Sequence, residues 1–131
     1  MKIKDYAFVK LKDETWIKVD FLKLVYIKAG ANYSHMYFEN GDRVIYKSPL
    51  IKLQCKLPLC FERVHNSYII NLNFINLIDF NEKTILLNNK MHISIGNAYK
   101  ENIERYFLIA LRSFYFDSIF DLGFGFNFLS S

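Results

Sequence analysis

Four polar residues near the middle of the chain have side chains that could contact nucleic acid. Residues 61–71 place two short apolar runs on either side of Arg63, His65, Asn66 and Ser67. Arginine and asparagine can form paired hydrogen bonds with the edges of guanine and adenine, and histidine and serine can contact bases or phosphates. Because the flanking apolar runs can pack as strands, the stretch predicts two strands that present a polar tip.

The charge of the chain fits such a tip. The 131 residues, 52% of them hydrophobic, suit a single domain with a core. The 17 basic and 13 acidic residues give a net charge of +4. Residues 111–131 carry a net charge of −1, so the positive charge lies on residues 1–110. This balance is compatible with a polyanionic partner but does not require one.

Residues for catalysis or metal binding are not grouped in the sequence. Cys55 and Cys60 lack metal-ligand spacing, and nothing at the N-terminus resembles a signal peptide, which predicts free thiols in a reducing cytoplasm. The histidines form no HExxH motif, so neither a metal nor a cofactor is expected. His65 and Ser67 lack an orienting acid, and GxGxxG, Walker and GxSxG motifs are absent. We therefore do not expect an enzyme.

Alternation of apolar and polar residues predicts a mainly β fold. Asp20 could cap a single helical turn at 21–23, and Asn40-Gly41 is typical of a type I′ hairpin turn. The strands are expected at residues 7–12, 15–19, 24–29, 33–38, 43–46, 61–64, 68–71, 75–80, 84–87 and 92–95.

Two segments have helical rather than strand periodicity. Ser48 as N-cap and Pro49 as first helical residue predict a short helix that ends near Pro58. Gly96 and Asn97 are expected to open a C-terminal helix. The apolar face of that helix consists of Ile103, Tyr106, Phe107, Ala110 and Leu111.

The end of the chain has a different composition. We expect a domain at residues 1–111 and an aromatic C-terminal extension at 112–131, where six of the thirteen phenylalanines lie. Arg112, Asp117 and Asp121 interrupt its apolar run, so it does not predict a membrane span. Three readings are open: packing on the sheet, an aromatic surface for another chain, or a remnant of a disrupted reading frame.

The chain from about Phe8 to Phe107 resembles the LytTR-type DNA-binding domain of bacterial transcriptional regulators. The similarity covers residues 19–27 and 31–33, the short helix before Cys60, and residues 61–71 and 93–100. Residues 61–71 are its most specific part: a phenylalanine, Arg-Val-His, a polar residue, Ser-Tyr and an aliphatic pair before asparagine.

The resemblance implies an elongated β fold of about ten short strands, with one short internal helix and a C-terminal helix. It also implies loops that enter successive major grooves of double-stranded DNA and bend it. The base-contacting positions of the family correspond here to Ser34 with its neighbour His35, to Asn66, and to Asn97.

Asn66 and Asn97 each have an alternative role that does not involve a base contact. Asn66 stands where many members carry arginine, and an amide pairs with adenine where arginine prefers guanine. Its alternative role is to shape the turn. Asn97 stands where arginine or lysine is usual, and its alternative role is to cap the helix, which is compatible with a nearby phosphate.

The basic residues around the tip also have two readings. If alternation holds, Arg63 and His65 lie on the strand face opposite Asn66. Arg63 could then hold a phosphate or pair with an acid, and His65 could fix the loop or act as a ligand. Lys100 is one of several dispersed lysines, of which two or three are expected to contact phosphates.

These observations favour a cytoplasmic, non-enzymatic transcriptional regulator that reads direct or inverted half-sites in DNA. A homodimer on repeated half-sites is expected. Because the chain begins almost at the domain itself, we expect that it acts alone, that a separate signalling protein supplies the input, or that its expression level is the control. The alternative is a protein-interaction module with the same fold and a weakened DNA surface, indicated by the two asparagines.

Overall fold

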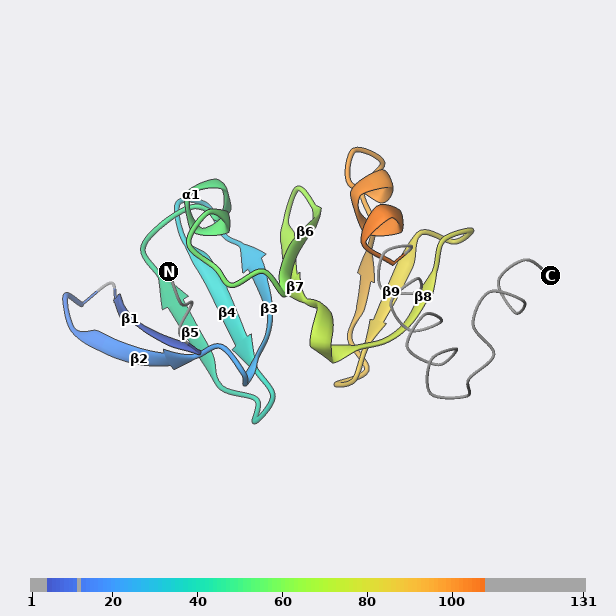
Figure 1. Ribbon diagram of the computed structural model, residues 1–131. Coiled ribbons are helices and arrows are strands. Elements are labelled where there is room, and N and C mark those ends of the chain that lie inside the picture. Colours follow the sequence, from blue (N-terminus) through green and yellow to red (C-terminus); the bar gives the residue numbers. More distant parts are fainter. Residues whose placement is uncertain (1–4, 12, 108–131) are drawn as a thin grey trace, which may run out of the picture. The chain divides into compact units, whose positions relative to one another are not determined.

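The largest sheet among the described residues has at its centre a strand whose first four residues are buried. A computed structural model describes residues 5–11 and 13–107. In it, five antiparallel strands pair in the order β5-β4-β3-β7-β6 (Figure 1). They are β3 (Leu24–Ala29), β4 (Ser34–Phe38), β5 (Arg43–Tyr46), β6 (Phe61–His65) and β7 (Tyr68–Asn71).

Strand β3 is buried along most of its length. Residues 24–27 are all buried, as expected for a central strand covered on both faces. A bulge between Leu24 and Tyr26 interrupts its pairing with β4. Because the bulge shifts the alternation by one residue, Leu24 and Ile27 both join the same core cluster.

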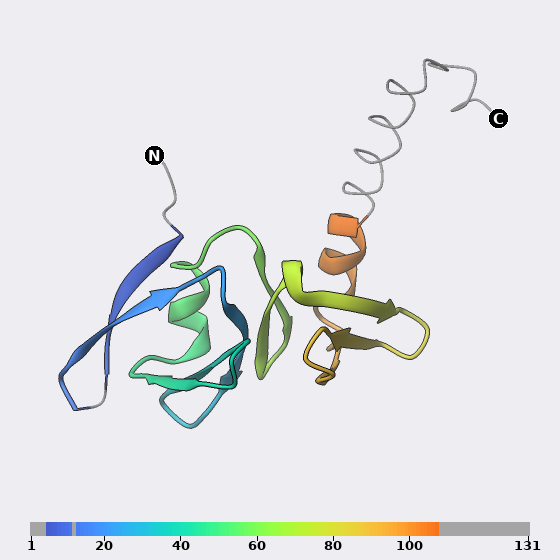
Figure 2. The same ribbon diagram turned by 90° about the horizontal axis from the view of Figure 1, so that it is seen from below.

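A hairpin and a short helix contribute to that core cluster (Figure 2). The hairpin consists of β1 (Tyr6–Lys10) and β2 (Trp16–Asp20), and the helix is α1 (Leu50–Gln54). Val9 and Val19 from the hairpin and Leu50 and Leu53 from the helix pack with residues of the five-stranded sheet. The opposite face of the hairpin leaves Phe8 and Trp16 exposed.

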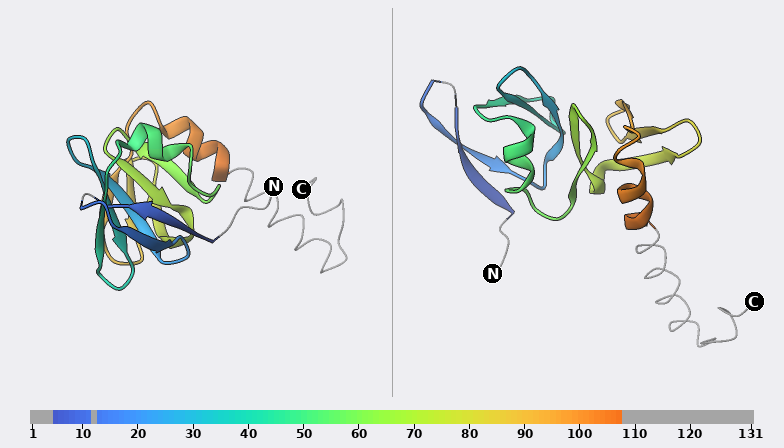
Figure 3. Two further views of the ribbon diagram at one scale, coloured as in Figure 1. Left: turned by 90° about the vertical axis from the view of Figure 1, so that its left-hand side faces the viewer. Right: turned by 90° about the horizontal axis from the view of Figure 1, so that it is seen from above.

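The third sheet is a separate three-stranded meander (Figure 3). It follows a short 3-10 helix, η1 (Leu72–Phe74), and has the order β10-β9-β8. Its strands are β8 (Ile75–Asp79), β9 (Thr84–Leu87) and β10 (His92–Ser94). Ile85, Leu87 and Ile93 are buried, and the alternation along β9 predicts a sheet with one covered face.

The predicted fold class is confirmed for the described residues, which form ten strands, a short internal helix and the start of a C-terminal helix at residues 100–107. All ten strands belong to the first of the two compact units of the chain, residues 1–100. The second unit is residues 101–131. The predicted boundary at 111/112 and the aromatic extension lie outside the described residues.

The Asn40-Gly41 turn differs from the type I′ prediction. Gly41 has a φ of +90°, but Asn40 is not among the described residues with positive φ, and a type I′ turn needs positive φ at both central positions. Gly41 N donates to Phe38 O and Phe38 N donates to Asp42 O. These bonds form a three-residue loop, in which only the last position needs glycine.

The two helix caps predicted from the sequence, Ser48 and Asp20, are corrected in part. Ser48 is not the N-cap of α1, because Pro49 occupies that position without a side-chain hydrogen bond. The carbonyl of Ser48 instead accepts a hydrogen bond from Ser34 Oγ. Residues 21–23 form a turn rather than a helix, although the Asp20 carboxylate does accept a hydrogen bond from Leu22 N as a cap would.

Asn71 connects the end of β7 to the turn before β3. It is 1% exposed, and its Nδ2 donates to Leu24 O at 3.0 Å and to Phe21 O at 3.3 Å. Its Oδ1 accepts from Asn73 N at 3.0 Å. A buried amide with partners at both ends fixes a single arrangement of the two chain segments.

Asn71→Ala should lower the free energy of unfolding by about 2 to 3 kcal/mol, because truncation leaves buried polar groups without partners. Urea denaturation of the full chain measures this. The matched control is Asn73→Ala, whose side chain is exposed and which should change stability by less than about 0.5 kcal/mol. Equal losses in both variants would contradict a stabilising role for the buried amide.

Candidate nucleic-acid interface

The polar tip predicted from the sequence is the turn between β6 and β7. Arg63 pairs with Ile69 and His65 pairs with Tyr68, so Val64 is an extra residue that bulges from β6 and is fully buried. A bulge breaks the alternation of side chains along a strand. The prediction that Arg63 and His65 lie on the face opposite Asn66 assumed unbroken alternation. The bulge at Val64 shows that this assumption does not hold here.

Arg63 holds the turn from within. Its Nε donates to His65 O at 2.9 Å, and one terminal nitrogen donates to Asn66 O. The other terminal nitrogen donates to Gln54 Oε1 at 3.0 Å. Arginine can bridge several acceptors because its donors form a rigid fork.

Burial raises the pKa of the neighbouring Glu62 carboxyl, so this acid loses its negative charge at a higher pH than an exposed glutamate.

His65 also stabilises the turn. Its Nδ1 accepts a hydrogen bond from Ser67 N at 3.0 Å, and its ring lies 5.8 Å from that of Tyr68. An accepting Nδ1 places the proton of a neutral ring on Nε2. Of the two readings of His65, these contacts favour the one in which it fixes the loop.

Asn66 is exposed at the tip, and its side chain meets a residue that is distant in sequence. Tyr99 donates its hydroxyl hydrogen to Asn66 Oδ1 at 3.0 Å. The segment that carries Tyr99 is attached to β6, because Gly96 N donates to Val64 O at 2.8 Å. Sequence reasoning did not identify Tyr99, although it lies within residues 93–100 that carry the resemblance.

Asn97 does not cap the helix as the alternative reading proposed. The described helix begins at residue 100, and Asn97 Oδ1 accepts a hydrogen bond from Lys83 Nζ at 2.6 Å. Lys83 lies in the turn between β8 and β9, and its carbonyl accepts from Ile95 N. No local pattern pointed to Lys83, since only strand pairing brings it to Asn97. Lys100 is half-buried at the first helical residue.

The positions 34 and 35 are less accessible than predicted. Ser34 is fully buried, and its Oγ donates to Ser48 O at 2.7 Å, so its prediction as a base contact is corrected. His35 is half-buried and packs over Gly30, where an added Cβ would lie 2.5 Å from its Nε2. Its Nδ1 is buried and has no hydrogen-bond partner among the described residues.

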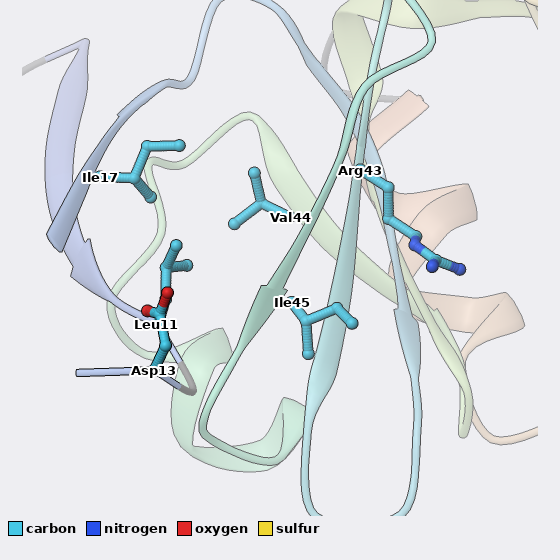
Figure 4. A pocket seen from close by; sticks show the side chains of 6 residues that line it. All are labelled: Leu11, Asp13, Ile17, Arg43, Val44 and Ile45. Atoms are coloured by element: carbon cyan, nitrogen blue, oxygen red, sulfur yellow. The ribbon is translucent and has the colours of Figure 1, made fainter. Parts of the chain in front are cut away.

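A depression of about 640 Å³ lies elsewhere, between the β1–β2 hairpin and β5 (Figure 4). Leu11, Ile17 and Val44 face one another across it, while the side chains of Arg43 and Ile45 lie on the other side of β5. Hydrogen bonds from Thr15 lower the pKa of the Asp13 carboxyl at its edge. These residues do not combine a base with a nucleophile.

Neither a metal site nor a membrane-spanning helix occurs in the described part of the chain. Residues 5–11 and 13–107 contain no group of three or more histidine, cysteine or acidic side chains that could hold a metal ion. None of the helices within these ranges is long and apolar enough to cross a bilayer.

Comparison with known proteins identifies the fold. The family of the LytTr DNA-binding domain matches residues 14–107. A solved structure, the LytTr DNA-binding domain of a protein described as a methyl-accepting/DNA response regulator from Bacillus cereus, is 25% identical, with a TM-score of 0.66. The match covers 78% of this chain and 95% of that one. A search of curated proteins gave no match. The chain therefore belongs to the LytTR family of DNA-binding domains.

Proposed function

We propose that this domain binds double-stranded DNA sequence-specifically in a bacterial transcriptional regulator, and that the β6–β7 turn brings Asn66 to a base edge in the major groove. The observation that carries the proposal is an exposed amide on an otherwise internally bonded turn. An amide can both donate to and accept from base edges, which phosphate-binding cations cannot do.

The rigidity of the turn supports a role in recognition. Arg63 and His65 bond to the backbone of the turn, so its conformation is set before a partner arrives. A side chain that is already ordered loses less conformational entropy on binding. The positive net charge favours approach to DNA through the phosphates.

The Asn97–Lys83 pair provides a second contact. Asn97 is exposed, and Lys83 adds a cation beside it. In this proposal, Lys83 and Lys100 contact phosphates and position the domain, while Asn66 reads the sequence in one major groove and Asn97 contacts the next. His35 supports its loop, and Ser34 is excluded because it is buried.

The protein acts in the cytoplasm, as a homodimer on repeated half-sites and with a separate signalling protein as its input.

An alternative function is a protein-interaction module with a weakened DNA surface. The observation in its favour is the exposed hairpin face, on which Phe8 is 61% and Trp16 is 64% exposed. Exposed aromatic residues are common at protein interfaces. The predicted contact through the C-terminal extension lies outside the described residues.

Selection from a pool of random DNA duplexes at low salt should enrich one sequence motif, and repeats within it report the half-site arrangement. Asn66→Ala should lose discrimination at one base pair by about 1 to 3 kcal/mol. Asn81→Ala, an exposed asparagine in the β8–β9 turn, is the matched control and should keep the motif. Failure of the wild-type protein to enrich any motif would rule out the proposal and leave the interaction module.

Lys83→Gln should weaken binding to all DNA sequences by a similar factor and reduce the slope of log affinity against log salt by about one. The reason is that a phosphate contact releases a counterion whichever bases are present. Affinity measured across a salt series tests this, with exposed Lys56→Gln after α1 as the control. A slope that stays at the wild-type value would show that Lys83 does not contact phosphate.

A further inference from the structure

The hydrogen bond between Tyr99 and Asn66 engages one end of the exposed amide. Tyr99 donates to Asn66 Oδ1 at 3.0 Å. A free asparagine side chain can rotate to present either Oδ1, an acceptor, or Nδ2, a donor of two hydrogens. With one lone pair of Oδ1 engaged by Tyr99, the amide keeps both hydrogens of Nδ2 but only one lone pair of Oδ1 for a partner.

The ring of Tyr99 is held independently of Asn66. Arg63 Cζ lies 5.7 Å from the ring centroid, within the range of a cation–π contact. Gly96 leaves room for the ring, since a Cβ at that position would lie 3.2 Å from Tyr99 Cδ2. Tyr99 N also donates to Gly96 O at 2.9 Å. The hydroxyl is therefore a fixed donor toward the tip.

We propose that Tyr99 is a specificity-determining positioning residue that makes Asn66 read hydrogen-bond acceptors, above all O6 and N7 of guanine, in preference to adenine. The inference rests on the proposed DNA binding. Paired recognition of adenine requires an amide oxygen that accepts from N6 beside a nitrogen that donates to N7. The Tyr99 hydroxyl competes with adenine N6 for that oxygen and orients it toward Tyr99, which disfavours the paired contact with adenine.

This contact changes the base that asparagine alone would favour. An unconstrained asparagine pairs with adenine, whereas guanine presents two adjacent acceptors to a donor group. The preference at this position therefore belongs to the pair Asn66 and Tyr99 rather than to Asn66 alone.

Tyr99→Phe tests the proposal because it removes the hydroxyl and keeps the ring. The base pair read by Asn66 is the one at which the Asn66→Ala variant loses its preference. In duplex selection, the wild-type protein should favour guanine over adenine at this base pair. In Tyr99→Phe, the ratio of guanine to adenine there should fall by roughly fivefold, the effect of one typical hydrogen bond. The salt slope and the affinity for unrelated DNA should stay unchanged, which would not hold if the domain had lost its structure.

Two further variants separate positioning from packing. Tyr99→Phe combined with Asn66→Ala should behave as Asn66→Ala alone, because the hydroxyl acts only through the amide. Tyr106→Phe removes the hydroxyl of an exposed tyrosine in the C-terminal helix and should keep the wild-type guanine preference. An adenine preference in the wild-type protein, or an unchanged ratio in Tyr99→Phe, would overturn the proposal while leaving DNA binding intact.

A measurement without DNA distinguishes failure of the contact from failure of the proposed function. The side-chain amide signals of Asn66 are those that vanish from the NMR spectrum of Asn66→Ala. They should shift in Tyr99→Phe and stay in place in Tyr106→Phe. Unshifted signals would overturn the Tyr99–Asn66 contact. Shifted signals together with no enriched motif would confirm the contact and overturn DNA reading, and the specificity role with it.

Discussion

The hydrogen bond from Gly96 N to Val64 O is the constraint on which the interface depends. Val64 can offer its carbonyl there because it bulges out of the β6–β7 pairing while its side chain is buried. This single bond attaches the segment after β10 to the β6–β7 turn. The contact of Arg63 with the Tyr99 ring and the bonds from Lys83 to the same segment add to this attachment. A strand irregularity thus determines the composition of the surface, as is common for bulges beside functional sites.

The polar residues of the central motif divide into those that build the turn and those that face outward. Arg63 and His65 direct their nitrogens at neighbouring backbone groups and at Gln54, which satisfies polar groups that a tight turn would otherwise leave without partners. Asn66 remains exposed. Of these residues, Arg63 and His65 therefore build the turn, and Asn66 is the one whose side chain is exposed at its tip.

Membership in a DNA-binding family and the arrangement of this site give complementary information. The family match and the structural similarity concern the fold and its class of partner. The contacts of Asn66 and Asn97 are features of this chain, and both amides bond to residues outside their own turn. Each amide oxygen already accepts a hydrogen bond, so these side chains offer donors to a greater extent than two unbonded asparagines would.

The sequence by itself determined the strand positions, the short helix and the exposure of the tip, because alternation, turn residues and helix periodicity are local properties of the chain. It also determined the family, through residues 61–71. Only the tertiary structure decided that Ser34 is buried, that Val64 bulges, and that Lys83 and Tyr99 bond to the two asparagines. These features arise from pairing between segments far apart in sequence, and no local pattern encodes which side chains such pairing brings together.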